Sequence, residues 1–418
     1  MDALTTPSNW QRVRLGDMTT SFTKQTGFDY SDFIKPTLIK EYLPNYIPFI
    51  QNKDFLGHYI NYKTDYFIPN EIAIRFPQIL LNEKCLLISI SGAIGNVAVF
   101  NHSQDAFIGG AIAVLKFKEK KSLDFVMHFL MSASGQKLLL NGVKSSSHKN
   151  LTIADLRDLL IPLPPLNEQI AIANILSDVD HYLCSLDALI LKKEGVKKAL
   201  SFELLSQRKR LKGFNQNWQR VRLGDIGITI NGLVGKTKQD FINGNAKYIT
   251  FLNVLNNVII DTSILENVKI YPNEKQNSFK KYDLFFNTSS ETPKEVGMCA
   301  VLLDDIDQVF LNSFCFGFRI FDKAVDSLFL SYLINSEIGR KAFENLAQGS
   351  TRYNLSKSGF NNVCLFLPPL NEQIAIADIL SALDKEIASL KNKKRQFENI
   401  KKALNHDLMS AKIRVLKK

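Results

Sequence analysis

The chain has 418 residues, of which 45% are apolar and 22% are charged, a composition that suits a folded protein with two or three hydrophobic cores. Its 52 basic and 41 acidic residues give a net charge of +11, which favours a polyanionic partner but also fits a ribosomal or membrane-surface protein. The five cysteines form no Cys-x-x-Cys pair and no apolar run reaches about 18 residues, so we expect reduced thiols, a cytoplasmic location and no membrane span.

Two short segments occur twice and divide the chain into two halves. Residues 9–17 (Asn-Trp-Gln-Arg-Val-Arg-Leu-Gly-Asp) are identical to residues 217–225. Residues 163–173 (Leu-Pro-Pro-Leu-Asn-Glu-Gln-Ile-Ala-Ile-Ala) are identical to residues 367–377, which lie 204 positions later. The repeats indicate a tandem duplication in which each half holds a variable body and then a helical segment. We therefore predict globular domains over 1–162 and 213–366 and helical segments over 163–212 and 367–418.

Both variable bodies are predicted to be rich in strands. Short β-branched or aromatic runs bounded by Asn, Gly and Pro are typical of strands. In the first body they cover 46–50, 85–90, 96–100 and 112–117, and in the second 248–251, 283–286, 298–303 and 314–321. Helical spacing follows over 125–140 and over 328–347. Strands followed by a helix predict an α+β domain for each body.

A long helix is predicted after each Leu-Pro-Pro-Leu. The prolines stop the preceding chain and deliver it to a helix start. We expect Asn167 and Asn371 to be the N-caps. Glu168 and Glu372 then place negative charge in the first turn, where the unpaired N–H groups favour it.

These helices carry apolar residues at alternating steps of four and three, the pattern of a coiled-coil seam. The seam positions are Ile172, Leu176, Val179, Leu183, Leu186, Ile190, Leu200 and Leu204 in the first helix and Ile376, Leu380, Leu383, Ile387, Leu390, Phe397, Leu404 and Leu408 in the second. Lysines interrupt it at Lys193, Lys197, Lys394 and Lys401, and Gly195 allows a bend. We predict that the two helices pair with each other as an antiparallel coiled coil, which makes the chain a pseudo-two-fold tandem repeat.

A polar loop precedes each Leu-Pro-Pro-Leu segment at the same distance in both halves. Hydroxyls, amides and cations packed this densely are the groups that bind phosphates and read base edges, although a merely solvated loop is the alternative. Further polar runs, which are weighed in the same way, lie over 89–96 in the first half and over 236–238 and 287–292 in the second. The candidate DNA-contacting residues are Lys144, Ser146, Ser147, His148, Lys149, Asn150, Lys236, Lys238, Ser350, Thr351, Arg352, Tyr353 and Asn354.

The sequence contains no complete catalytic or metal-binding motif that we recognise. Gly235-Lys236-Thr237 resembles the end of a P-loop, but Ile230 stands where the required first glycine would be. The apolar Leu163 and Leu367 cannot accept a hydrogen bond from a target amine, so the Leu-Pro-Pro-Leu segments are not methyltransferase motifs. The six histidines show no ligand spacing. We expect no catalytic residue, no metal site and no cofactor in this chain.

The whole layout resembles the DNA-specificity (S) subunit of a type I restriction-modification enzyme. Residues 162–169 (Pro-Leu-Pro-Pro-Leu-Asn-Glu-Gln) carry the signature of that family, and residues 367–373 repeat it with Phe366 in place of the first proline. The resemblance implies two target-recognition domains, each reading one half of a bipartite double-stranded DNA sequence, and paired helices that set the gap. It also implies two methyltransferase (M) subunits and two motor-nuclease (R) subunits as partners, which would bind S-adenosylmethionine, ATP and Mg²⁺.

Two other functions fit parts of the sequence. A coiled-coil scaffold whose bodies bind proteins would need no salt-dependent affinity for DNA. A self-contained nuclease or methyltransferase would turn over DNA without partners. We expect a non-catalytic DNA-recognition subunit.

Overall fold

The computed structural model describes residues 9–25, 27–57, 59–141, 150–344, 346, 349 and 353–415. The chain forms two compact units. The first combines Met1–Asp187 with Lys393–Lys418, and the second is Ala188–Asn392. Each unit therefore contains one globular body and one stretch from each of two long helices, α6 (Leu166–Leu205) and α12 (Leu370–Met409).

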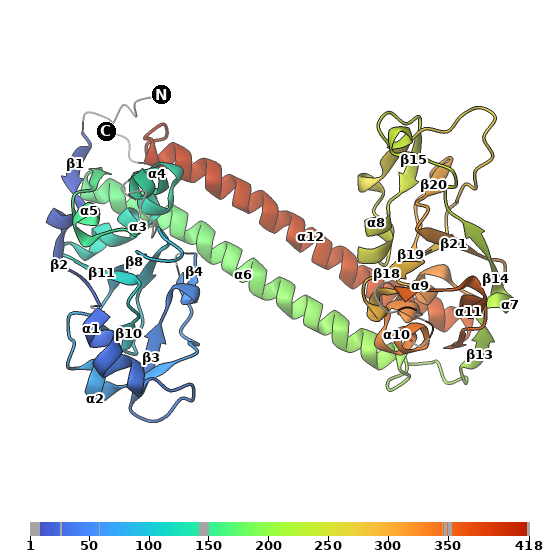
Figure 1. The fold of residues 1–418 in the computed structure, drawn as a ribbon, viewed down its shortest axis with the longest axis horizontal. Coiled ribbons are helices and arrows are strands. Elements are labelled where there is room, and N and C mark those ends of the chain that lie inside the picture. The colour runs from blue at the N-terminus through green and yellow to red at the C-terminus, as the bar shows by residue number, and fades with distance from the viewer. Residues whose placement is uncertain are drawn as a thin grey trace. The chain divides into compact units, whose positions relative to one another are not determined.

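The first unit builds its body around two four-stranded sheets, and its main helices are α3, α4 and α5 (Figure 1). One sheet has the order β2-β11-β8-β9 and is antiparallel, and the other has the order β6-β3-β10-β7, in which β3 and β10 are parallel. The strands and helices are β2 (Thr19–Lys24), β3 (Tyr46–Ile50), β6 (Phe67–Pro69), β7 (Leu80–Leu81), β8 (Cys85–Ser89), β9 (Val97–Phe100), β10 (Ala106–Ile108), β11 (Ile112–Phe117), α3 (Leu123–Met131), α4 (Ala133–Asn141) and α5 (Ile153–Arg157).

The second unit repeats this arrangement with different side chains. Its sheets have the orders β14-β21-β17-β19 and β16-β15-β20, and β15 and β20 are parallel. The strands and helices are β14 (Gly227–Asn231), β15 (Ala246–Ile249), β16 (Glu266–Val268), β17 (Leu284–Asn287), β18 (Ser289–Ser290), β19 (Cys299–Val301), β20 (Val309–Leu311), β21 (Cys315–Ile320), β22 (Tyr353–Asn354), α7 (Leu223–Ile226), α8 (Phe251–Asn256), α9 (Ser327–Asn335), α10 (Glu337–Glu344) and α11 (Lys357–Asn361).

The central strands are apolar on both faces because each lies between two cores. Leu86 of β8 packs into the core under α3, whereas Leu87 packs into the core of the second sheet. Phe286 and Phe285 of β17 divide in the same way between two cores of the second unit. Burial on both faces explains why these strands appear in the sequence as continuous apolar runs rather than as alternating ones.

The repeated Gln-Arg-Val-Arg segments close each body. β1 (Gln11–Arg14) pairs with β12 (Leu160–Leu163), and β13 (Gln219–Arg222) pairs with β23 (Cys364–Leu367). In each half, the repeated Gln-Arg-Val-Arg segment therefore pairs with the strand that leads into the repeated Leu-Pro-Pro-Leu segment. Trp10 packs edge-on against Phe125 at 6.2 Å between ring centroids, and Trp218 packs against Phe329 at 6.0 Å.

The predicted single helices over 125–140 and 328–347 are each two helices, so this part of the prediction is wrong. α3 ends at Met131 and α9 ends at Asn335, and the serine that follows each helix, Ser132 or Ser336, has extended backbone. Each serine hydroxyl donates to the carbonyl three residues earlier, and accepts from the N–H of Gly135 or Gly339 three residues later. This side-chain bonding competes with continuation of the helix.

Close packing requires a glycine at position 135, in the turn that follows α3, but not at position 195 in the middle of α6. A Cβ on Gly135 would lie 2.0 Å from the Phe129 carbonyl oxygen, whereas a Cβ on Gly195 in α6 would meet nothing within 4 Å. We expect Gly135→Ala to lower the free energy of unfolding by about 1–3 kcal/mol through overpacking. Gly195→Ala should raise it by about 0.5–1 kcal/mol through helix propensity. Denaturant unfolding of both variants checks this, and equal effects would contradict it.

Both long helices are continuous and begin before the predicted caps. α6 and α12 start at Leu166 and Leu370, so the assignment of Asn167 and Asn371 as N-caps is wrong. The Pro165 carbonyl accepts hydrogen bonds from the N–H groups of residues 168 and 169, and the Pro369 carbonyl does the same for 372 and 373. The second proline of each motif therefore takes the N-cap position, and its carbonyl accepts the first hydrogen bonds of the helix. No break occurs at Gly195.

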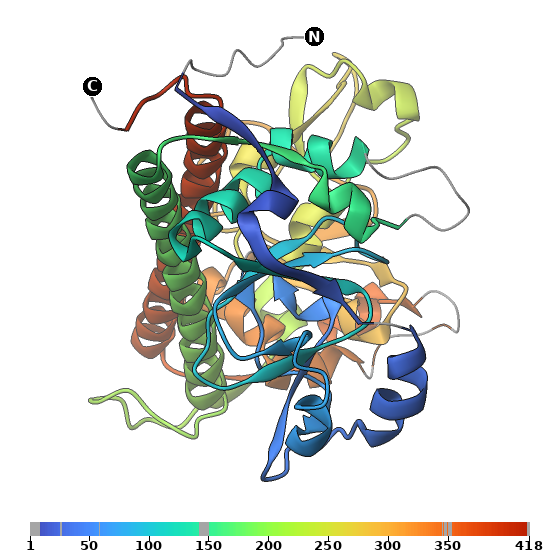
Figure 2. The ribbon, with the colours of Figure 1, turned by 90° about the vertical axis from the view of Figure 1, so that its left-hand side faces the viewer.

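Within each unit, the stretch of α6 lies antiparallel to the stretch of α12 (Figure 1 and Figure 2). In the first unit Asp180 and Asp187 pair with Lys401 and Lys394, so the residue numbers rise along one helix and fall along the other. In the second unit Lys193 and Lys197 pair with Glu386 and Asp384 in the same manner. The seam residues Ile172, Leu176, Ile376 and Leu380 are buried. The predicted α+β tandem repeat with an antiparallel helix pair is confirmed.

The glutamates of the repeated motif are buried ion-pair partners. Glu168 is bound by the Arg414 guanidinium at 2.7 and 3.0 Å, and Glu372 is bound by the Arg210 guanidinium at 2.7 and 2.6 Å. The glutamate side chains are 3% and 1% exposed. Each arginine follows the C-terminal end of the other long helix, so the motif fixes the two helices to each other in both units.

A second equivalent contact ties each body to both helices. In the first unit His128 of α3 lies 4.0 Å from Asp180, which also pairs with Lys401. In the second unit the Tyr332 hydroxyl of α9 donates to Asp384 at 2.7 Å, and Asp384 also pairs with Lys197. Burial raises the pKa of Tyr332, and its hydrogen bond to the Asp384 carboxylate raises it further.

Candidate nucleic-acid interface

In both units the chain before α5 or α11 is joined to the polar turn that follows the central strand. In the first unit Ser91 forms a β-bridge with Asn150, and the Leu151 N–H donates to the Ile90 carbonyl at 3.0 Å. In the second unit β18 pairs with β22, with Ser289 opposite Asn354 and Ser290 opposite Tyr353. The two polar regions singled out in each half of the sequence are therefore neighbours.

The carboxyl ends of the parallel strands reach the same turn. The Asn52 side chain, which follows β3, donates to the Ser91 carbonyl at 2.5 Å. In the second unit the Thr288 N–H and hydroxyl donate to the carbonyl of Phe314, which follows β20, at 2.9 and 2.8 Å. We call these two equivalent regions the recognition edges. They comprise Gln51, Asn52, Lys53, Ser91, Gly109, Gly110 and Asn150 in the first unit and Thr288, Ser289, Ser290, Phe314, Tyr353 and Asn354 in the second.

The recognition edges differ in shape and chemistry. The first contains a cavity of about 280 Å³ that is lined by Gln51, Asn52, Lys53 and the segment 109–112. Amides and a lysine surround this cavity. The second presents the half-buried Thr288 and the Phe314 ring, which is 53% exposed, whereas Ser289 and Ser290 are buried beneath them. Amides and hydroxyls that act as both donor and acceptor suit base edges, and an exposed ring suits apolar contact.

The polar residue that ends each central strand has a structural role. Ser89 and Asn287 are fully buried. The Ser89 hydroxyl accepts from the Asn96 N–H at 2.9 Å, and the Asn287 side chain accepts from the Met298 N–H at 2.7 Å. Each of these side chains therefore closes the turn beneath its recognition edge.

Most of the sequence-predicted loop residues lie outside the described part of the chain. Asn150, Tyr353 and Asn354 are described and belong to the recognition edges. The residues that lie outside the description are Lys144, Ser146, Ser147, His148, Lys149, Ser350, Thr351 and Arg352. Contact of this whole set with DNA stays a prediction. Gln51 and Asn52 were not predicted from the sequence, because only the strand topology brings them to the same edge as the polar runs.

The two predicted lysines near residue 236 differ in environment. The Lys236 ammonium pairs with Glu274 and donates to the Lys269 carbonyl, and its side chain is 4% exposed. The hydrogen bond from this ammonium lowers the pKa of the Glu274 carboxyl. Lys236 therefore stabilises its own loop. Lys238 is exposed at the start of a short 3₁₀ helix, Lys238–Phe241. Their contact with DNA also stays a prediction.

The described residues contain neither a cluster suited to a metal ion nor a helix long and apolar enough for a bilayer. No three His, Cys, Asp or Glu side chains gather with ligand geometry in those ranges. Neither long helix, nor any shorter one in the ranges the structure describes, has the apolar length of a membrane span.

Two unlike recognition edges on one duplicated frame define a two-domain recognition module. Residues 7–193 and 215–399 both match the family model for the type I restriction modification DNA specificity domain. Because these matches cover most of the chain, the chain belongs to this family, and the resemblance to type I specificity subunits is confirmed.

Two relatives resemble the chain in sequence, and a solved structure resembles it in fold. The chain is 26% identical to the type I restriction enzyme MjaVIII specificity subunit of Methanocaldococcus jannaschii, over 99% of this chain and 95% of that protein. Over 29% of this chain and 26% of the relative it is 26% identical to the Escherichia coli EcoBI specificity subunit. The crystal structure of a type I restriction-modification S subunit from M. genitalium superposes with a TM-score of 0.62 at 16% identity, over 96% of each chain. That likeness shows the fold.

Proposed function

We propose that this chain reads a bipartite double-stranded DNA target, with one half-site per globular body, as the non-catalytic specificity subunit of a type I complex. The observation that carries the proposal is the recognition edge, which occurs twice in the same place with different side chains. Gln51, Asn52 and Lys53 around the cavity of the first edge, and the half-buried Thr288 with the exposed Phe314 ring in the second, give the two edges different chemistry. Two different patterns on one frame support two different half-sites.

The remaining parts have supporting roles in this proposal. The predicted loop residues Lys144 to Asn150 and Ser350 to Asn354 contact the DNA. Because stiff paired helices are suited to spacing, α6 and α12 set the gap between half-sites. Two M subunits dock on this chain and recruit two R subunits, and S-adenosylmethionine, ATP and Mg²⁺ bind those partners.

A salt titration of DNA binding tests recognition against the scaffold alternative. We expect the purified chain to bind duplex DNA with an affinity whose logarithm falls linearly with the logarithm of salt concentration, because bound phosphates release counterions. Filter binding with its cognate duplex and a scrambled duplex gives the slope and the preference. Salt-independent or absent binding, both for the chain alone and with its M subunit, would favour the scaffold.

A further inference from the structure

Three buried polar atoms near the cavity of the first recognition edge form no hydrogen bond. Gln25, the residue directly after β2, is 3% exposed, and neither its Nε2 nor its Oε1 has a partner in the described part of the chain. The Nδ2 of Asn52 donates to the Ser91 carbonyl, whereas the buried Oδ1 of the same side chain accepts no hydrogen bond from those residues. Because buried polar side chains are nearly always hydrogen-bonded, three such atoms indicate an occupant that supplies their partners.

A glycine keeps the Gln25 amide next to the cavity. Gly110 lines the cavity, and a Cβ added to Gly110 would lie 3.3 Å from the Gln25 Oε1. Asn52 lines the same cavity. The cavity measures about 280 Å³, just below the roughly 300–1,000 Å³ of sites for drug-sized ligands, so it suits one small group. Such a group lies within reach of both carboxamides.

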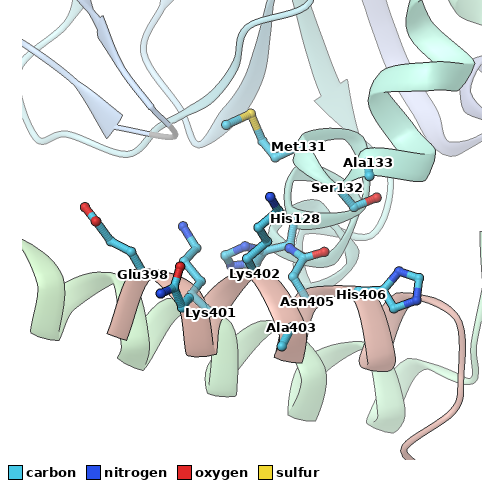
Figure 3. A pocket seen from close by; sticks show the side chains of 11 residues that line it. His128, Met131, Ser132, Ala133, Glu398, Lys401, Lys402, Ala403, Asn405 and His406 are labelled. Atoms are coloured by element: carbon cyan, nitrogen blue, oxygen red, sulfur yellow. The ribbon is translucent and has the colours of Figure 1, made fainter. Parts of the chain in front are cut away.

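The second unit has different residues at the equivalent places. The residue directly after β14 is Gly232, and a Cβ there would lie 2.3 Å from the Asn312 carbonyl oxygen, so backbone fills the place of the Gln25 side chain. Two positions after the first parallel strand, Asn52 corresponds to Phe251. By contrast, the cavities beside the α3–α4 turn (Figure 3) and the α9–α10 turn occur at equivalent places in both units. The carboxamide site therefore belongs to the variable part of the first body.

The lining favours a nucleobase over a phosphate. Lys53, the cation in the lining, is paired with Asp65, so the cavity offers amides rather than a free charge. The Gln25 Nε2 can donate, and the Gln25 and Asn52 oxygens can accept. An amino group next to a ring nitrogen matches this set, because it supplies two donors and one acceptor. Adenine and cytosine have such an edge, whereas thymine does not.

Burial of the Gln25 amide implies that the base leaves the duplex to reach it. Side chains that read an intact duplex extend into its grooves, which a side chain that is 3% exposed does not do. A base that has left the stack can enter a pocket, where hydrogen bonds to its freed edge identify it.

We propose that the cavity of the first recognition edge receives one adenine or cytosine extruded from the first half-site, and that Gln25 and Asn52 bind the amino edge of this base. The inference rests on the proposed function, which brings DNA to this edge. It adds a base-binding pocket, and it implies that only the half-site bound by the first body is opened in this manner.

A mismatch scan of the cognate duplex with the full chain, without M subunit, tests the extrusion. Each adenine or cytosine of the first half-site is kept while its partner base is changed to leave it unpaired, and filter binding gives the affinity. We expect one position at which the mismatch raises the affinity at least about tenfold, because a base that is already unpaired costs less to extrude. Mismatches at the other positions of the half-site should lower the affinity or leave it unchanged.

Apolar replacement of the two carboxamides tests the pocket. Gln25→Leu and Asn52→Leu should each abolish the gain from the mismatch and lower the affinity for the paired cognate duplex at least about tenfold. Gln104→Leu replaces an exposed amide of the same body outside the recognition edge and should keep both properties. Because leucine removes an unsatisfied buried amide, Gln25→Leu should keep or raise the denaturant midpoint, which shows that weaker binding does not come from misfolding.

Three results would contradict the inference, and each has a different meaning. If both variants bind the cognate duplex as tightly as the unaltered chain, ordered water alone fills the cavity, although DNA reading stands. If the variants bind weakly but no mismatch raises the affinity, the base is read within the duplex and extrusion is excluded. If the unaltered chain does not prefer its cognate duplex to a scrambled one, the proposed function fails and the inference fails with it.

Discussion

Replacing Glu372 by alanine is expected to lower the free energy of unfolding by about 3–5 kcal/mol, the range found when one partner of a buried ion pair is removed. The Glu372 carboxylate is 1% exposed and accepts two hydrogen bonds from Arg210. Without it, the partly buried guanidinium would lose its partner and the two helices of the second unit would lose a contact. Denaturant unfolding monitored by circular dichroism measures the change.

The chain supplies an equivalent and a control for this variant. Glu168→Ala removes the matching contact with Arg414 in the first unit and should have a similar effect. Glu398→Ala removes an exposed ion pair with Lys394, which lies one turn earlier on α12. We expect this change to lower the free energy of unfolding by less than about 0.5 kcal/mol. If Glu372→Ala and Glu398→Ala had the same effect, the buried pairs would not hold the frame.

Inserting four residues into each long helix is expected to lengthen the gap in the recognised DNA by about two base pairs. Four residues add about 6 Å of helix, and base pairs are about 3.4 Å apart. The insertions belong after Asp187 in α6 and after Asn392 in α12, where one unit ends and the other begins. The methylated motif of cells that express the altered chain with its M subunit measures the gap.

The comparison requires both helices to change together. An insertion in α6 alone shifts the pairs of Lys193 and Lys197 with α12 out of register and should reduce binding without defining a new gap. An unchanged gap after the matched insertion would exclude the helices as the spacing element.

The frame was predictable from the sequence because it is repeated. The duplicated motifs located both long helices, and the apolar seam indicated their pairing, which the buried Ile172 and Ile376 reflect. The role of Glu168 and Glu372 was not predictable, because the partner arginines lie far along the chain. Local pattern gives a helix end, whereas tertiary contacts decide what the charge there binds.

The recognition edges were only partly predictable. The composition of the sequence identified the polar loops. It did not predict that they pair with the turns after β8 and β17, because that pairing depends on strand order, which the apolar pattern does not determine. The breaks at Ser132 and Ser336 were missed for a similar reason. A serine followed three residues later by glycine can end a helix. We predicted one continuous helix in each half because the apolar residues keep helical spacing on both sides of the serine.

Mapping methylated bases in the genome of a host that carries this chain and its M subunit tests the central claim most directly. We predict one motif with two short specified halves, different in sequence and separated by a constant unspecified gap, and loss of that motif when this chain is deleted. Methylation at an uninterrupted motif, or a motif that persists without this chain, would contradict the claim that two unlike recognition edges on one duplicated frame select the DNA.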